Sequence, residues 1–180
     1  MIVLNSLSIM TLEKDAERPY LKRKEQMEIV LAKKEDLAIV RKITRSTIKS
    51  IYPRYYPAGA VEFFLMHHSD ERIMEDISAG KVFVLYEALT PVGTVTISDN
   101  NINRLFVLPE YQHRGFGKAL LDYAEKKILD RYEYVQIDAS FPAKGLYLKR
   151  GYKETEYHII EADNGDRLCY DVMRLEKRDG

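Results

Sequence analysis

The chain has 180 residues, 46% of them hydrophobic and 31% charged, which is typical of one globular domain with a sizeable core. Its 28 basic and 28 acidic residues cancel, so no global basic field favours nucleic acid as a partner. The single cysteine, Cys169, cannot form a disulfide within the chain, which fits a reducing compartment. No apolar run approaches the roughly 20 residues that span a bilayer, and the N-terminus lacks the features of a signal peptide. We therefore expect a cytoplasmic protein with no membrane partner.

The first part of the chain differs in character from the rest. Residues 13–25 are a dense mixture of charges interrupted by Pro19, a pattern typical of a solvated segment. A cleaner apolar pattern begins at Met27. We therefore expect an N-terminal extension over residues 1–26 and one folded domain over residues 27–180.

The first half of that domain predicts a strand, several helices and a hairpin. Residues 27–32 are typical of a strand, and Glu35 and Asp36 then stand where a helix dipole favours acidic side chains. Prolines and tyrosines break the pattern over residues 51–59. The periodicity next predicts two short helices over 61–67 and 73–77, and two strands over 81–86 and 92–97 joined near Thr90-Pro91.

The second half predicts two strands, two helices and a final hairpin. Asn100-Asn101 turns the chain into a strand, which a loop and an amphipathic helix follow. Residues 134–139 predict the next strand, and Pro142 suits the first turn of a short helix that Gly151 ends. Asn164-Gly165 is a strong turn signal between strands over 152–161 and 168–175. The whole order indicates a mixed α/β protein with a central sheet.

A phosphate-binding loop is the most informative local pattern. The sequence Gln112-His113-Arg114-Gly115-Phe116-Gly117 follows a strand and Pro109 and opens directly into a helix. The first N–H groups of a helix have no partner within it, and its dipole attracts anions. Gly115 and Gly117 have no Cβ, so phosphates can approach the main chain. Arg114 adds a donor suited to phosphate.

Two common phosphate motifs do not fit this loop. Gly117-Lys118 matches the end of a P-loop, but Gln112 and Ala119 break that pattern. A dinucleotide fingerprint fails at Leu120 and lacks its βαβ context. The remaining pattern, Q-x-x-G-x-G, resembles the coenzyme A pyrophosphate loop of the GNAT superfamily of N-acetyltransferases. The preceding residues 107–111, VLPEY, are similar to that family's V-x-P-x-[YF] lead-in.

A second segment also resembles the family. Residues 140–152, SFPAKGLYLKRGY, are similar to its S/N-x-x-A-x-x-x-Y-x-x-x-G-[FY] pattern. The resemblance implies a single-domain α/β fold with a central, mixed but mostly antiparallel sheet of about seven strands flanked by helices. It also implies an acetyl-CoA-dependent N-acetyltransferase that transfers the acetyl group directly to a primary amine in a ternary complex. A non-catalytic acyl-CoA-binding or sensing domain, and an interaction module that has lost the ligand, remain open alternatives.

The resemblance also assigns roles to residues. Tyr147 is the expected proton donor to the coenzyme A sulfur, and its alternative role is a packed helix tyrosine. Ser140 is expected to contact the cofactor, although a helix N-cap explains it equally well. The residues expected to bind the cofactor are Val107, Gln112, His113, Arg114, Gly115, Phe116, Gly117, Lys118 and Ser140.

The general base and the acceptor are less well defined by the sequence. Many family members carry a Glu shortly before the lead-in, where this chain has Asn101 and Asn103. A water chain, an acceptor that arrives deprotonated or a base from another element are the alternatives. The candidate side chains for such a base are Glu62, His67, His68 and Asp138.

The tyrosines before the first short helix are candidates for acceptor binding. Tyr52, Tyr55 and Tyr56 can form an aromatic wall for an amine cation, or they can pack between helix and sheet. We expect the acceptor to be a small-molecule amine or a peptide N-terminus, and a homodimer is possible through the edges of the terminal hairpin. The adjacent His67 and His68 diverge by about 100° on a helix, so we expect no metal site.

Overall fold

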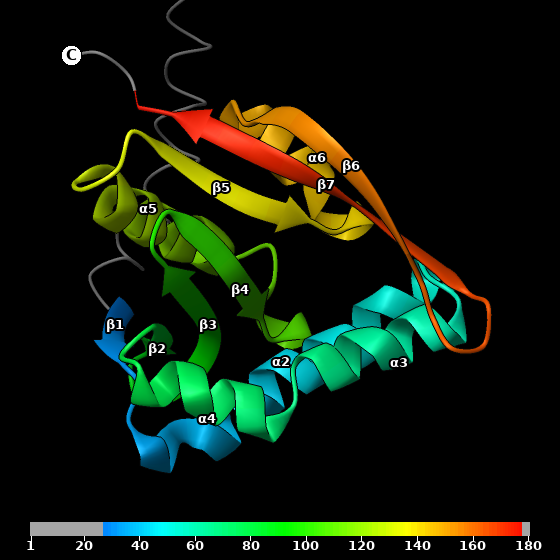
Figure 1. Ribbon diagram of the computed structural model, residues 1–180. Coiled ribbons are helices and arrows are strands. Elements are labelled where there is room, and N and C mark those ends of the chain that lie inside the picture. Colours follow the sequence, from blue (N-terminus) through cyan, green and yellow to red (C-terminus); the bar gives the residue numbers. More distant parts are fainter. Residues whose placement is uncertain (1–26, 178–180) are drawn as a thin grey trace, which may run out of the picture.

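A computed structural model describes residues 27–177 of the chain, which form an α/β fold (Figure 1). The predicted extension, residues 1–26, lies outside the described residues, so its boundary stays a prediction. The strands are β1 (Met27–Leu31), β2 (Val82–Glu87), β3 (Thr90–Ser98), β4 (Asn101–Val107), β5 (Tyr134–Ala139), β6 (Lys153–Glu161) and β7 (Arg167–Glu176). The α-helices are α2 (Leu37–Ile51), α3 (Ala58–His67), α4 (Asp70–Ser78), α5 (Phe116–Leu129) and α6 (Phe141–Arg150). Short 3-10 helices are η1 (Lys34–Asp36), η2 (Tyr52–Arg54) and η3 (Pro109–Tyr111).

The seven strands form one sheet in the order β1-β2-β3-β4-β5-β7-β6. Neighbouring strands are antiparallel except β4 and β5, which run parallel. This exception follows from the connections, because α5 carries the chain from the end of β4 back to the start of β5. The expected mixed, mostly antiparallel seven-strand sheet is confirmed.

Helices cover both faces of the sheet (Figure 1). Apolar residues of α5 pack on one face, where Leu120, Leu121 and Ala124 are fully buried with Val95 and Val135 of the strands. Helices α2, α3 and α4 enclose a second core on the other face. The central strands alternate their side chains between these two cores, so along β4 and β5 successive residues point to opposite faces of the sheet.

The parallel pair β4–β5 is joined over a short length. Only Asn101↔Gln136 and Ile102↔Ile137 are paired, and beyond them the arrows separate toward their tips (Figure 1). The register between β3 and β4 shifts at this point, because Ile97 pairs with Ile102 while Thr96 pairs with Arg104. Asn103 is thus an extra residue in β4, and such a bulge bends a strand away from its neighbour.

Some predicted boundaries were wrong by a few residues. The β2–β3 turn lies at Ala88-Leu89, where Ala88 has φ of 54°, and not at Thr90-Pro91. Pro91 is tolerated because it stands near the start of its strand. Helices α3 and α4 each begin three residues earlier than predicted, at Ala58 and Asp70.

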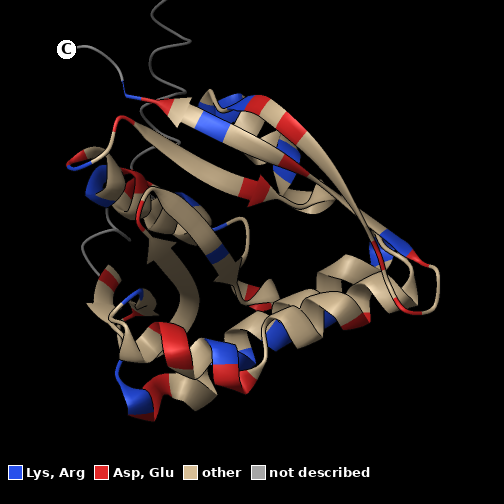
Figure 2. Cartoon of the chain, viewed as in Figure 1, with Lys and Arg blue, Asp and Glu red and all other residues tan. Residues whose placement is uncertain are grey.

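The outer surface carries charges of both signs. Figure 2 shows basic and acidic residues mixed along α4 and on β6 and β7, whereas α3 is almost free of them. Over residues 27–177, no helix combines the length and the apolar character that crossing a membrane requires.

Candidate functional site

The predicted phosphate loop adopts a strained, open conformation between η3 and α5. His113 has φ of 60° and Gly115 has φ of 91°, both in the left-handed region, and Gly115 occupies the N-cap position of α5. Because non-glycine residues rarely adopt such angles, the conformation at His113 has to be stabilised by its surroundings. This backbone path aims successive N–H groups of the loop outward.

Several of those N–H groups have no acceptor within the described part of the chain. Ala119 is the first residue of the helix to bond backward, to the carbonyl of Gly115. The N–H groups of His113, Gly115, Phe116 and Gly117 donate no hydrogen bond among residues 27–177. Together with the positive end of the α5 dipole, they form a site suited to an anion.

The loop also has room for a ligand beside the main chain. A Cβ built on Gly117 lies 3.9 Å from Val107 Cγ2, an ordinary contact, so the protein itself leaves space there. The Phe116 side chain is buried in the core, so this residue offers only its main chain to a ligand. These features fit a pyrophosphate held mainly by N–H groups.

The polar side chains of the loop contact the protein itself. Arg114 donates to both Glu87 carboxylate oxygens, at 2.8 and 2.9 Å, and its guanidinium lies 5.0 Å from the Tyr111 ring centre. Gln112 Nε2 donates to the carbonyl of Val107 at 3.0 Å, and Lys118 pairs with Asp122. The predicted phosphate donor Arg114 therefore ties the loop to β2.

Main-chain groups of β4 face the gap between β4 and β5. Leu108 N–H donates to the Val92 carbonyl of β3 at 2.9 Å. Since successive residues of a strand direct their main-chain groups to opposite edges, those of Leu105 and Val107 face β5. The Val107 carbonyl already accepts from Gln112 and from Thr47 Oγ1, which leaves its N–H for a ligand in the gap.

Tyr147 lies on α6 and is buried, 4% exposed, with its ring 5.5 Å from that of Tyr152. Burial raises the pKa of Tyr147, and the neighbouring Tyr52 and Glu125 raise it further. Its hydroxyl therefore stays protonated at neutral pH. This hydroxyl has no hydrogen-bond partner within residues 27–177, so it is available as a donor.

The other tyrosines of the predicted acceptor wall divide into two groups. Tyr52 and Tyr56 are buried, whereas Tyr55 is 52% exposed. Tyr52 donates to Ser140 Oγ at 3.3 Å, and the Tyr56 hydroxyl accepts from the Phe141 N–H at 2.8 Å. Ser140 occupies the N-cap position of α6, but its side chain makes no capping bond. These contacts join η2 to the start of α6.

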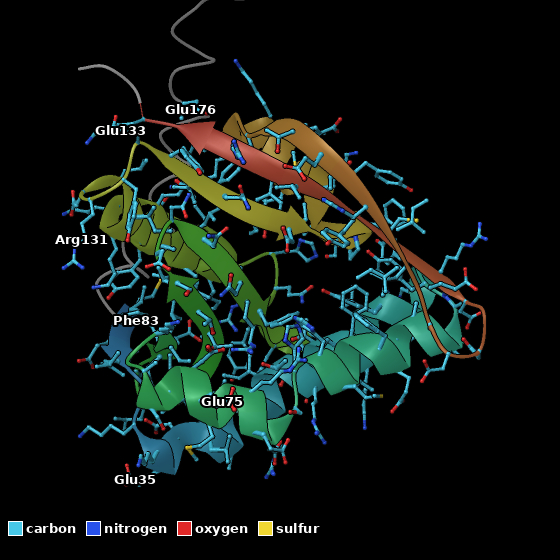
Figure 3. The ribbon with its side chains drawn as sticks, in the orientation of Figure 1. Glu35, Glu75, Phe83, Arg131, Glu133 and Glu176 are labelled. Carbon is cyan, nitrogen blue, oxygen red and sulfur yellow. The ribbon has the colours of Figure 1, made fainter. Side chains whose placement is uncertain are left out.

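A polar cleft of about 280 Å³ opens where β4 and β5 separate. It lies between the sheet and the helices α3 and α4, on the face opposite α5. None of the eight residues lining it has an apolar side chain. They are His67, His68, Arg72, Glu75, Asp76, Asn103, Arg104 and Asp138. Glu75 extends from α4 in Figure 3.

A buried arginine organises one wall of this cleft. Arg104 of β4 is 5% exposed and donates to Asp76 Oδ2 at 3.0 Å, Thr96 Oγ1 at 2.8 Å and His68 Nδ1 at 3.3 Å. Since His68 Nδ1 accepts a hydrogen bond, this imidazole is neutral with its proton on Nε2. Burial, followed by the charge of Arg104, holds the pKa of His68 well below 6.5.

The cleft brings together three of the four candidate bases. His67, His68 and Asp138 line it with Asn103, whereas Glu62 does not. Arg72 Nη1 lies 2.8 Å from His67 Nδ1, and desolvation lowers the pKa of this histidine. Within residues 27–177, no group of three His, Cys, Asp or Glu is arranged to hold a metal ion. Sequence patterns gave no sign of the Arg104 network, because its four members come from four separate stretches of the chain.

Comparison with known proteins identifies the class of protein that this fold and site define. The family profile described as "Acetyltransferase (GNAT) domain" matches residues 51–165, and the chain belongs to this family. It is therefore an acyltransferase with acetyl-CoA as its cosubstrate. The prediction made from the two motifs is confirmed at this level.

Individual relatives agree with the family assignment. The chain is 26% identical over 122 residues to the uncharacterized N-acetyltransferase YafP of Escherichia coli strain K12, covering 68% of this chain and 75% of YafP. A GCN5-related N-acetyltransferase structure from Rhodopseudomonas palustris superposes with a TM-score of 0.76 at 24% identity, covering 83% of this chain and 95% of that one. The PaiA N-acetyltransferase of Thermoplasma acidophilum, solved with coenzyme A, gives 0.64 at 23%, covering 84% and 99%. At these identities the two structures demonstrate the fold alone.

Proposed function

We propose that this protein transfers the acetyl group of acetyl-CoA directly to a primary amine in a ternary complex. The observation that carries the proposal is the group of four main-chain N–H groups, those of His113, Gly115, Phe116 and Gly117, that have no acceptor among the described residues at the N-terminus of α5. These groups would bind the pyrophosphate, and the gap between β4 and β5 would receive the thioester arm. The structural neighbour PaiA was solved in complex with coenzyme A, which supports a ligand of this class.

The chemistry assigned to the site needs no covalent enzyme intermediate. The amine attacks the thioester carbonyl, an N–C bond forms and the C–S bond breaks. Tyr147 donates a hydrogen bond and then a proton to the departing sulfur, a role that suits a buried, protonated hydroxyl. The Val107 N–H, which faces the gap, is placed to bind the thioester arm.

The experiment is a calorimetric titration of acetyl-CoA into the wild-type protein and into Gly117→Glu. Gly117 has space for a Cβ and lacks a positive φ, so the variant should fold while it places a carboxylate at the proposed pyrophosphate site. We expect acetyl-CoA affinity to fall at least about 100-fold, a loss of about 2.7 kcal/mol.

The matched control is Gly145→Glu, which makes the same change at a helical glycine with nothing within 4 Å of its Cβ. This control should bind acetyl-CoA as the wild type does. Unchanged acetyl-CoA affinity in Gly117→Glu would show that the loop is not part of the acetyl-CoA site. No binding by the wild-type protein would refute the proposed function itself.

The proposal also covers the compartment and the oligomeric state of the protein. We expect a cytoplasmic protein, and the free thiol of Cys169 is consistent with a reducing compartment. A homodimer is expected through β6, which is the last strand of the sheet order and exposes Tyr157 and Ile159. Light scattering after gel filtration would decide this, and a monomer at all concentrations would contradict it.

A further inference from the structure

Asp138 lies at the point where the sheet opens. The last paired residues of the parallel strands are Ile102 and Ile137. Asp138 is the next residue of β5, and the bulged Asn103 is the next residue of β4. Both side chains line the polar cleft. A ligand arm that enters the gap from the α5 side would therefore end beside Asp138.

The alternation of β5 determines the face on which Asp138 lies. Val135, Ile137 and Ala139 are buried in the core that α5 covers. Because successive strand residues point to opposite faces, Asp138 projects toward α3 and the cleft. The carboxylate thus meets the gap from the face opposite the phosphate loop, so an acceptor can approach without crossing the path of the cosubstrate.

The carboxylate of Asp138 is unengaged within residues 27–177, where it makes no hydrogen bond or ion pair with another side chain or the main chain. The neighbouring cleft groups differ, because Arg104 pairs with Asp76 and Arg72 contacts His67. The two arginines and three carboxylates that line the cleft give it one net negative charge while both imidazoles are neutral. This charge favours a cation.

The charged and titratable groups around Asp138 come from three other elements. His67 lies on α3, His158 and Glu156 lie on β6, and Tyr170 lies on β7. Desolvation raises the pKa of Asp138, while His158 and His67 oppose that rise. An aspartate whose pKa is raised is a better proton acceptor than one in water.

We propose that Asp138 binds the ammonium group of a small polar primary amine and accepts one of its protons, which frees the amine to attack acetyl-CoA. This inference rests on the proposed function and adds the missing base. The amine nitrogen forms the N–C bond, the C–S bond breaks, and coenzyme A leaves as the thiol with a proton from Tyr147. The second proton that the nitrogen loses returns to the Tyr147 oxygen, and the proton on Asp138 passes to water. The polar lining of the cleft disfavours amines with a large apolar group.

The test compares wild type, Asp138→Asn and Asp130→Asn in a thiol-release assay with acetyl-CoA. Spermidine and glucosamine are the polar probes, and phenethylamine is the apolar one. Asp130→Asn is the matched control, because Asp130 is an aspartate at the C-terminal end of α5 that does not line the cleft. We expect kcat/KM of Asp138→Asn for the polar probes to fall about 100-fold or more at pH 7, and Asp130→Asn to stay within about two-fold of wild type.

Two further readouts separate a base from a structural role. Acetyl-CoA affinity by calorimetry should be unchanged in Asp138→Asn, and its residual kcat/KM should rise steeply with pH as the free amine fraction grows. Full activity of Asp138→Asn, or loss of acetyl-CoA binding together with activity, would overturn the inference. So would a wild-type protein that binds acetyl-CoA but acetylates neither polar probe or prefers phenethylamine. Failure of the wild type to bind acetyl-CoA would instead refute the proposed function.

Discussion

At the residue scale, Tyr147 combines features that a purely structural tyrosine seldom has. It is buried among apolar side chains, and its hydroxyl has no partner among the described residues. A hydroxyl without a protein partner is free to donate to a ligand, as the proposed role of Tyr147 requires. The raised pKa keeps it protonated over the whole physiological range.

Tyr147→Phe should therefore lower kcat about 100-fold without lowering thermal stability. The lost group is a donor to the sulfur, and no protein partner is left unpaired. Steady-state kinetics and thermal denaturation of the same samples measure both effects. Tyr123→Phe, a similar change at a partly buried tyrosine of α5, is the control and should leave kcat unchanged. A stability loss without a kinetic effect in Tyr147→Phe would assign the residue to packing.

His68 connects the cleft to the pH dependence of stability. Its pKa is held well below 6.5 by burial, by Arg104 and, to a smaller extent, by His67 and Arg72. The unfolded chain therefore binds more protons than the folded one below about pH 6.5, and stability falls as pH falls through that window. Above it, both states carry a neutral imidazole and this contribution is constant.

His68→Asn should flatten that dependence. The Asn Oδ1 can accept from Arg104 Nε in place of His68 Nδ1, and the side chain does not titrate. Between pH 6.5 and 5, we expect the variant to lose about 1 kcal/mol less unfolding free energy than wild type. Urea denaturation at several pH values measures this difference. Equal slopes for both proteins would show that His68 does not control acid stability.

At the element scale, Gly93 determines how closely α5 approaches the sheet. A Cβ at this position would lie 2.9 Å from Leu120 Cδ1 and 3.1 Å from the Phe106 carbonyl oxygen. Leu120 is fully buried and the second atom belongs to the backbone, so neither can move aside freely. The N-terminal turn of α5, whose N–H groups are proposed to bind the pyrophosphate, thereby packs directly on β3.

Gly93→Ala should push α5 away from the sheet. We expect a loss of stability of about 1–3 kcal/mol, as for other overpacked cores, together with weaker acetyl-CoA binding. Denaturation and calorimetry test the two effects. Gly145→Ala is the control, because its new Cβ has nothing within 4 Å and should stabilise α6 by up to about 1 kcal/mol. If Gly93→Ala is destabilised but binds acetyl-CoA as tightly as wild type, the packing of α5 on β3 does not control binding by the loop.

At the scale of the whole molecule, the sequence predicts individual helices and strands better than it predicts which strands pair in the sheet. Alternation along residues 81–86 and the Asn164-Gly165 turn encode local structure, so these elements were recognised. Pairing of β4 with β5 was not recognised, because residue alternation specifies the two faces of a strand but not the strand beside it. The family resemblance implied a mixed sheet but did not say which strands run parallel.

The candidate site divides in the same way. The phosphate loop is contiguous in sequence, so its glycines and the helix after it were sufficient to predict it. Asp138 was only one of four weak candidates for the base, because its environment comes from α3, β6 and β7. The Arg104–Asp76–His68 cluster likewise joins residues 28 and 36 positions apart. Such groups can be related only once the fold brings them together.

The short junction between β4 and β5 has a mechanical consequence. In the sheet formed by residues 27–177, only two residue pairs connect strands β1 to β4 with strands β5 to β7 by strand pairing. A thioester arm bound between β4 and β5 would add hydrogen bonds where the two strands are not paired, and it would hold the two parts of the sheet together. Amide hydrogen exchange at Leu105 and Val107 should then slow when acetyl-CoA is added, while the β2–β3 ladder exchanges at its former rate. Equal protection of these two amides with and without acetyl-CoA would mean that the two parts of the sheet are already held rigidly together.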